Sequence, residues 1–253
     1  MTEEAPRIES SWTPAPVPER RPRGDEIDVW AIDLAPSAGR LRELRALLDA
    51  EEITRAERFH FERHRRRFIV RRGAMRILLS AYLGRRADDL RFTLGTSGKP
   101  DLADPPAGAR LAFNLTDSED FALLAVGEGA ELGVDVEALE RPRDADRLVE
   151  RFFSEPEREV YAGLPDDLKT AGFFRAWTCK EAYLKAIGTG LQTPLRDSTV
   201  ELDPRRPSRM IEVAGSASEA ARWSLRELRP RRGFAGALAR RQRLGALRLF
   251  RWA

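Results

Sequence analysis

The chain has 253 residues, of which 42% are hydrophobic and 34% charged, and its formal net charge is +3. This length suffices for one large domain or two smaller ones, and no apolar run reaches the roughly 18 residues of a membrane span. A net charge this small names no partner by itself, although local clusters of charge could. We expect neither a nucleic acid nor a membrane as the main partner.

The scarcity of cysteine and histidine excludes several kinds of site. Cys179 is the only cysteine, which rules out internal disulfides and is typical of a reducing cytoplasm, where we expect the protein to reside. His60 and His64 are the only histidines, too few for a His-rich zinc site or a Ser-His-Asp triad. Of the 44 basic residues only four are lysines, as a GC-rich genome would produce, so each lysine is worth following.

The predicted elements of the first half begin after a tail. Residues 1–26 are rich in proline and charge, lack the apolar segment of a signal peptide, and are predicted to be disordered. A helical pattern starts near Arg40 and includes a long helix over 63–83, which we expect Gly84 to end. The apolar face of that helix comprises Phe68, Ile69, Met75, Leu79 and Leu83. Strands are predicted at 27–34, 90–94, 110–116 and 121–126.

The second half repeats this order without repeating the residues. Helices are predicted over about 144–163 and over 169–187, the latter ending at Gly188, and strands at 198–202, 222–228, 233–239 and 246–250. We therefore expect an α+β fold of two pseudo-duplicated halves, 27–127 and 128–253. Each half is predicted to be a small, mostly antiparallel sheet packed with a long helix, with the active site in the cleft between them.

The segment "LGVDVE" (132–137), which precedes these helices, alternates as a strand does. Leu132, Val134 and Val136 face one way, and Gly133 with the acids Asp135 and Glu137 faces the other. Two like charges on one strand face repel each other. Either an edge strand exposes them to water, or a cation binds there.

The long helix over 169–187 adds a third carboxylate. Trp177, Glu181 and Lys185 follow one another at intervals of four residues, so they lie close together on the helix. Taken alone, Glu181 and Lys185 form an ordinary surface ion pair. Together with the two acids of the strand, Glu181 forms an all-oxygen site suited to Mg²⁺, which commonly shares its ligands with substrate phosphates.

Phosphate-binding candidates lie in the first half. Residues 57–76 carry eight arginines against two glutamates, although most of these arginines are expected on a solvated helix face. The turn "TSGKPDL" (96–102) offers backbone N–H groups and the ammonium of Lys99. The segment "FNLTDS" (113–118) ends a strand with Asn114, Thr116 and Ser118, which are either donors to a phosphate or ordinary turn residues.

In this order and spacing, these segments resemble the larger, two-half class of 4′-phosphopantetheinyl transferases, the surfactin-synthetase-activating type. The resemblance covers about residues 40–200 and depends most on "WTCKEAYLKAIGTGL" (177–191). It implies that coenzyme A is the co-substrate, that its phosphopantetheine arm moves to a serine of an acyl- or peptidyl-carrier protein, and that 3′,5′-ADP is released. It also implies a monomer.

The resemblance further implies roles for single residues. Asp135, Glu137 and Glu181 hold Mg²⁺, Glu181 is the catalytic base, and Lys185 is the catalytic cation that stabilises the departing phosphate. The residues implied to bind coenzyme A are Arg55, Gly98, Lys99, Pro100, Asn114, Thr116, Asp117 and Lys185. An arginine-rich rim suits the acidic helices of carrier proteins.

Asp117 departs from the pattern, because the family usually has a phosphate-contacting histidine there. A carboxylate near phosphates weakens binding unless it turns away and neighbouring arginines compensate. Two other functions therefore remain open. One is a relative that binds coenzyme A or a carrier with altered or no transfer, and the other is a nucleic-acid binder using the arginines of 57–76.

Overall fold

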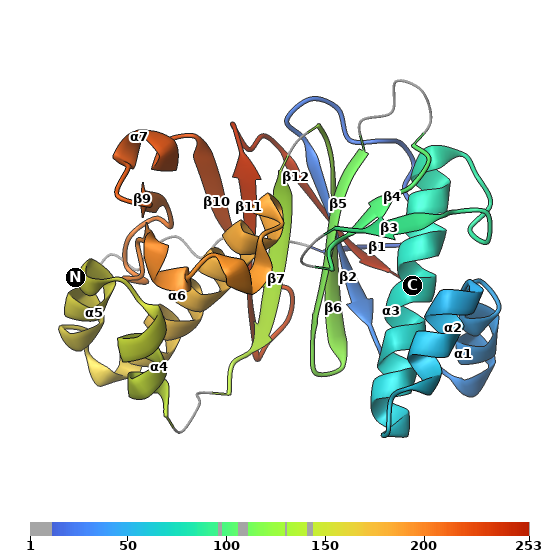
Figure 1. Ribbon diagram of the computed structural model, residues 1–253, viewed down its shortest axis with the longest axis horizontal. Coiled ribbons are helices and arrows are strands. Elements are labelled where there is room, and N and C mark those ends of the chain that lie inside the picture. The colour runs from blue at the N-terminus through green and yellow to red at the C-terminus, as the bar shows by residue number, and fades with distance from the viewer. Residues whose placement is uncertain (1–11, 96–97, 106–110, 130, 141–143, 253) are drawn as a thin grey trace.

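Two sheets lie face to face at the centre of the computed structural model, and a long helix covers the outer face of each (Figure 1). The structure describes residues 12–95, 98–105, 111–129, 131–140 and 144–252. The order of layers is helix α3, a five-stranded sheet, a three-stranded sheet and helix α6. This arrangement confirms the predicted α+β class and the long helix in each half.

The elements of the first half follow the predicted order, apart from two short strands at Thr13–Ala15 and Pro100–Leu102 that were not predicted. Its helices are α1 (Ala38–Arg45), α2 (Ala50–Glu57) and α3 (Glu62–Leu83), and Gly84 ends α3 in the left-handed conformation, as expected. Its strands are β1 (Thr13–Ala15), β2 (Ile27–Asp33), β3 (Phe92–Leu94), β4 (Pro100–Leu102), β5 (Leu111–Ser118) and β6 (Phe121–Glu128). The predicted strand at 110–116 includes Arg110, which lies outside the described residues.

The second half begins with β7 (Leu132–Ala138), the predicted acidic strand. Its helices are α4 (Ala145–Phe152), α5 (Glu155–Ala162), α6 (Asp166–Ile187), η1 (Gly190–Gln192), η2 (Leu195–Asp197) and α7 (Ala217–Ala220). Its remaining strands are β8 (Ser198–Val200), β9 (Met210–Val213), β10 (Trp223–Leu228), β11 (Phe234–Arg241) and β12 (Leu247–Trp252). Gly188 ends α6 in the left-handed conformation.

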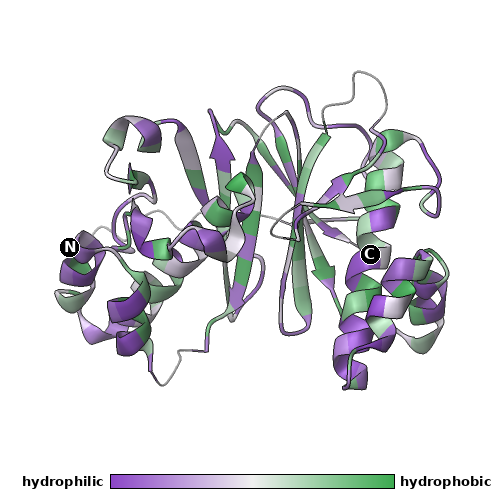
Figure 2. Cartoon of the chain, in the orientation of Figure 1, coloured by the Kyte–Doolittle hydropathy of each residue, from purple (hydrophilic) through white to green (hydrophobic). Residues whose placement is uncertain are grey.

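Side-chain alternation along the strands builds a core on both faces of the five-stranded sheet. In β6, Leu124 and Val126 pack toward α3, whereas Leu123 and Ala125 pack toward the other sheet. On β7, the apolar residues all face the central core between the sheets, so the acids face α6 as predicted. Hydrophobic and hydrophilic residues accordingly alternate along the strands and the helices (Figure 2).

The first sheet differs from the predicted one, because the last strand of the second half joins it. β12 lies between β1 and β2 and runs parallel to both, so the sheet is mixed rather than mostly antiparallel. The boundary predicted at 127/128 therefore does not separate two independent sheets. Asp28, which is fully buried on β2, accepts hydrogen bonds of 2.7 and 2.8 Å from Arg248 on β12.

The tail predicted to be disordered is partly built into the fold. Residues 12–26 are described, and β1 pairs with β12 at the edge of the sheet. The indole of Trp12 donates a hydrogen bond of 3.1 Å to the carbonyl of Arg229. Residues 1–11 lie outside the described part. Within the described part, no helix is long and apolar enough to cross a bilayer.

Gly133 explains how α6 approaches the acidic strand. A Cβ at this position would overlap the carbonyl oxygen of Ala182 and the backbone nitrogen of Ala186. The helix backbone therefore crosses β7 directly over the glycine, and this contact brings Glu181 and Lys185 to the acids of the strand.

Candidate active site

The acidic strand meets the end of α6 at Asp135. This carboxylate is buried, and its Oδ1 accepts hydrogen bonds from the ammonium of Lys185 and, at 3.2 Å, from the hydroxyl of Thr116. Lys185 also donates to Thr116 at 2.8 Å. The other carboxylate oxygen, Oδ2, is buried without a hydrogen-bond partner. A buried carboxylate oxygen lacking a donor is costly, so this atom is suited to a cation.

A row of polar side chains on β5 joins the two sheets. Asn114 Oδ1 accepts a hydrogen bond of 2.8 Å from the backbone of Val134. Ser118 accepts one of 3.2 Å from the backbone of Ala138 and donates one of 3.0 Å to Glu137. These residues are spaced two apart, so they share one face of β5, and that face meets β7. Asn114 and Ser118 thus hold the acidic strand in place.

Negative charge is concentrated in this region. Burial, and next the charge of Asp135, raise the pKa of Glu137, while Ser118 and Lys185 offset part of the increase. The pKa of Glu181 is raised by the same two causes in the same order and is lowered by Lys185. Both glutamates are therefore close enough to Asp135 for its negative charge to raise their pKa values, as expected of residues in one site. A cation between them would relieve this repulsion.

The carboxylate oxygens of the site suit a magnesium ion, although the three carboxylates do not converge on one position. Within the described ranges, no three acidic, histidine or cysteine side chains form a ready-made metal site. The available atoms are carboxylate oxygens, the ligands Mg²⁺ prefers, and one of them has no partner. Mg²⁺ usually takes only one or two protein carboxylates and completes its shell with water and phosphate, so a partly open set is compatible with it.

A cavity of about 280 Å³ opens beside these acids and is lined from both halves. Its lining includes Glu181 and Lys185 of α6 and the arginines of α2 and α3, Arg55, Arg71 and Arg72. The predicted residues Gly98, Lys99, Pro100 and Asn114 also line it. A second cavity of about 800 Å³ shares Arg55, Phe68, Arg72 and Leu94 with the first, so the two cavities are neighbours.

Lys99 lines the cavity, but its ammonium is already bound. It donates to the carbonyls of Leu132 at 3.0 Å, Lys185 at 2.8 Å and Ala186 at 3.2 Å. Burial lowers its pKa. The predicted phosphate contact is therefore not what the structure shows at this ammonium. It instead ties the turn of the first half to β7 and to the C-terminal end of α6, where a cation is favourable.

Asp117 forms an ion pair with Arg71 on α3, so the carboxylate that departs from the family pattern has a cationic partner. Asp117 itself does not line the cavity, whereas Arg71 does. One of the outcomes considered from the sequence was that this aspartate turns away and leaves neighbouring arginines to compensate, and its position outside the cavity lining agrees with the first part of that outcome.

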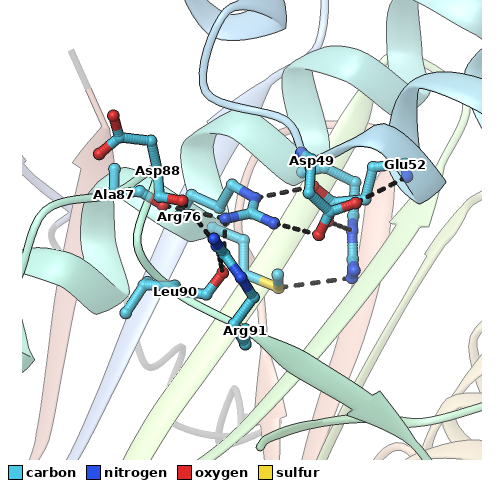
Figure 3. Close-up of polar contacts among 9 residues, drawn as sticks. Asp49, Glu52, Arg76, Ala87, Asp88, Leu90 and Arg91 are labelled. Atoms are coloured by element: carbon cyan, nitrogen blue, oxygen red, sulfur yellow. Dashed lines mark hydrogen bonds and ion pairs between the residues drawn. The ribbon is translucent and has the colours of Figure 1, made fainter.

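A buried arginine network holds the two helices that supply the arginines (Figure 3). Arg76 of α3 is fully buried and donates 2.7 Å hydrogen bonds to Asp49 and Glu52 at the start of α2. It also donates to the carbonyls of Ala87 and Leu90. α2 carries Arg55, so the network fixes that residue relative to α3. Sequence reasoning missed it, although the capping pattern of Asp49 and Glu52 was a signal.

Lys180 is a second residue whose role was not foreseen. It is fully buried and paired with Glu157 of α5, which also accepts a hydrogen bond of 2.8 Å from the backbone of Val200. The rarity of lysine was the available signal. Cys179 is buried in the core beside it, and burial raises the pKa of its thiol, which suits a packing role.

Comparisons with known proteins give a consistent result. The model of the 4′-phosphopantetheinyl transferase superfamily matches residues 131–239, and a model named 4′-phosphopantetheinyl transferase, N-terminal, matches 33–129. The 4′-phosphopantetheinyl transferase HetI of Nostoc sp. is 40% identical over 223 residues, covering 88% of this chain and 90% of that protein. The 4′-phosphopantetheinyl transferase psf-1 of Bacillus pumilus is 29% identical over 70% of this chain and 75% of its own length.

A solved structure also matches part of the chain. It is a holo-(acyl-carrier-protein) synthase from Bacillus anthracis in complex with CoA (3′,5′-ADP), 29% identical over 44% of this chain and 93% of that one. The TM-score is 0.36, which is too low to compare the two folds.

Proposed function

The chain belongs to the 4′-phosphopantetheinyl transferase superfamily, and from this premise we propose that it transfers the 4′-phosphopantetheine arm of coenzyme A to a serine of an acyl- or peptidyl-carrier protein, releasing 3′,5′-ADP. The observation that carries the proposal is the meeting of Asp135, Lys185 and Thr116 beside a cavity lined by Glu181. This set combines a cation, a hydroxyl donor and carboxylates where a pyrophosphate would react.

The cationic residues of the site support a phosphate-transfer reaction. Coenzyme A carries about four negative charges, and phosphoryl transfer depends mainly on positioning and on stabilising charge at the departing oxygens. Lys185 lines the cavity and is held by Asp135 and Thr116, so its ammonium is already oriented toward the site. In the proposed reaction, Lys185 stabilises the negative charge that develops on the leaving 3′,5′-ADP.

Glu181 is the proposed base for the carrier serine. It lines the cavity next to Lys185, and its raised pKa makes it a stronger base than an exposed glutamate. Its carboxylate takes the proton of the serine hydroxyl, directly or through a water, as the serine oxygen attacks the phosphorus. The bond to the 3′,5′-ADP oxygen breaks as the new bond forms.

Asp135, Glu137 and Glu181 are the residues proposed to hold Mg²⁺, and their oxygen donors, including the unpartnered Oδ2 of Asp135, support this. When bound, the ion would neutralise charge on the pyrophosphate. Ser118 and Asn114 keep the strand that carries the two acids in register with β5.

A mass measurement tests the proposed function. Wild-type protein incubated with coenzyme A, Mg²⁺ and an apo carrier should add about 340 Da to the carrier, the mass of the transferred arm. Glu181→Gln should abolish the gain, because it removes the base, whereas Glu159→Gln, an exposed change on α5, should leave it intact. No gain with wild type over a panel of acyl- and peptidyl-carriers would contradict the proposal.

The two other functions considered from the sequence are less well supported. Asp117 was the feature that favoured binding without transfer, and its ion pair with Arg71 accounts for it. The arginines of 57–76 suggested nucleic-acid binding, yet several of them are engaged with acidic partners, including Arg67, Arg72 and Arg76.

A further inference from the structure

Each acid of β7 meets a hydrogen-bond donor from α6. Trp177, Glu181 and Lys185 follow one another at intervals of four residues on this helix. The ammonium of Lys185 donates to Asp135, and the indole of Trp177 hydrogen-bonds to Glu137, two residues further along the strand. Glu181 therefore stands between two donors on the helix, and each donor contacts one acid of the strand.

The ring of Trp177 is held on two sides by other aromatic rings. Phe173, one turn earlier on α6, stacks on it with ring centroids 5.8 Å apart and an angle of 18° between the planes. Phe152 of α4 meets it edge-on, at 5.7 Å and 88°. Rings packed in this way leave the indole little freedom to rotate. Its N–H therefore keeps one direction, and a donor of fixed direction favours one orientation of the carboxylate that accepts from it.

Glu137 is held from both halves of the molecule. Ser118 of β5 donates a 3.0 Å hydrogen bond to its Oε2, and Trp177 of α6 is the second donor. Burial, and next Asp135, raise the pKa of Glu137, whereas the hydrogen bonds from Ser118 and Trp177 are among the causes that lower it. A carboxylate has about four acceptor positions, so two hydrogen bonds leave it free to bind a cation as well.

A tryptophan in the chain that serves packing alone looks different. Trp223 is 7% exposed, meets Tyr183 edge-on at 4.8 Å, and has a buried indole nitrogen without a hydrogen-bond partner. Trp177 is only partly buried, and its N–H meets a carboxylate of the candidate site. This contrast indicates that the N–H of Trp177 has a role in addition to that of its ring.

We propose that Trp177 is a positioning residue, whose indole N–H holds Glu137 in the orientation in which its carboxylate binds Mg²⁺. This inference rests on the proposed function, in which Glu137 is one of the residues that hold the ion. Removing a group that orients a metal-binding side chain typically lowers metal affinity about 10- to 100-fold. Trp177→Phe keeps an aromatic ring between Phe152 and Phe173 and removes the donor.

Calorimetric titration with Mg²⁺ in the presence of coenzyme A tests the inference without a carrier and without transfer. Trp177→Phe should lower the affinity for Mg²⁺ about 10-fold. Glu137→Gln should lower it at least as much, and adding Trp177→Phe to Glu137→Gln should have little further effect, because the N–H acts through that carboxylate. Trp177→His keeps a ring N–H and should bind Mg²⁺ more tightly than Trp177→Phe.

Trp223→Phe is the matched control, because the same substitution there removes an N–H that has no acceptor. It should leave the affinity for Mg²⁺ unchanged. The inference would be overturned by unchanged affinity in Trp177→Phe with the unfolding temperature retained, by equal losses in Trp177→Phe and Trp223→Phe, or by full additivity with Glu137→Gln. None of these results would affect the transferase proposal. If wild type bound no Mg²⁺, the proposed metal site would fail together with this inference.

Discussion

At the residue scale, the site is dominated by carboxylates whose charge is only partly balanced. The pKa values of Glu137 and Glu181 are raised mainly by burial and next by Asp135. Over the pH range between the unfolded and the raised pKa, the folded protein therefore binds more protons than the unfolded one. Stability from these groups is consequently fully present at low pH and decreases as pH rises through the raised pKa values.

This sign leads to a prediction about metal. Mg²⁺ should raise the unfolding temperature at pH 7.5 to 8, where the carboxylates are ionised, and the increase should disappear as pH falls, because protons compete for the same oxygens. Thermal unfolding with and without Mg²⁺, measured from pH 8 down to pH values below the raised pKa values of Glu137 and Glu181, tests the prediction. Asp135→Asn should eliminate it, and Asp120→Asn should retain it. An equal Mg²⁺ effect in Asp135→Asn would place the ion elsewhere.

Most candidate residues could be identified from the sequence, but not all of their partners. Asp135 and Lys185 were predicted from alternation and from helical spacing, and the structure joins them in an ion pair. The partners of Lys99 are backbone carbonyls, which every residue carries, so no residue pattern could indicate them. The partner of Asp117 lies 46 positions away on α3, a distance that only tertiary packing bridges.

At the element scale, the crossing of α6 over β7 depends on the absence of one side chain. Gly133→Ala would insert a Cβ into the backbone of α6, so the helix must move away from the strand. We expect a loss of about 3 kcal/mol in the free energy of unfolding, together with reduced activity, since Lys185 moves with the helix. Urea unfolding measures this. Gly163→Ala, whose added Cβ would meet nothing closer than 3.6 Å, is the control and should have little effect.

Lys99 fastens the end of the same helix. Lys99→Met would leave three carbonyls without their donor, and we expect about 2 kcal/mol of lost stability together with a lower kcat, because the backbone of Lys185 is one of the three. Lys169→Met is the matched control, because its Asp166 partner is 96% exposed and such pairs contribute little. If Lys99→Met raised only KM for coenzyme A, with stability unchanged, a direct phosphate contact would be indicated instead.

The predicted elements agree best where periodicity is long. α3 and α6 were predicted to within three residues because their apolar faces extend over several turns. β1, β4, β9 and α7 were missed, and each has only three or four residues, too few to show a period.

At the scale of the whole molecule, the two halves share a sheet, which the sequence did not indicate. Strand pairing between residues about 220 positions apart leaves no local pattern in the sequence. Nothing in the sequence around Asp28 indicates that this aspartate is buried and paired with Arg248. The α+β class and the long helix of each half were predicted correctly, because each half repeats the same order of elements.

A fragment of residues 1–127 should therefore not fold by itself. It lacks β12, and it exposes the face of the sheet that carries Val29 and Leu123, which are fully buried in the intact protein. Circular dichroism and gel filtration should show an unfolded or aggregated fragment. Adding residues 128–253 as a separate chain should restore a folded complex. A monomeric fragment with cooperative unfolding would refute this expectation.

The late arrival of β12 has a consequence for synthesis on the ribosome. Until residues 247–252 emerge, β2 pairs with β6 alone and presents an open hydrogen-bonding edge next to Trp30, the ring on which Phe250 later stacks. The nascent chain must keep this edge from pairing with other polypeptides while residues 129–246 are translated. The five-stranded sheet is therefore expected to be completed only after β12 has emerged, and its folding to be sensitive to chaperones that shield exposed strand edges.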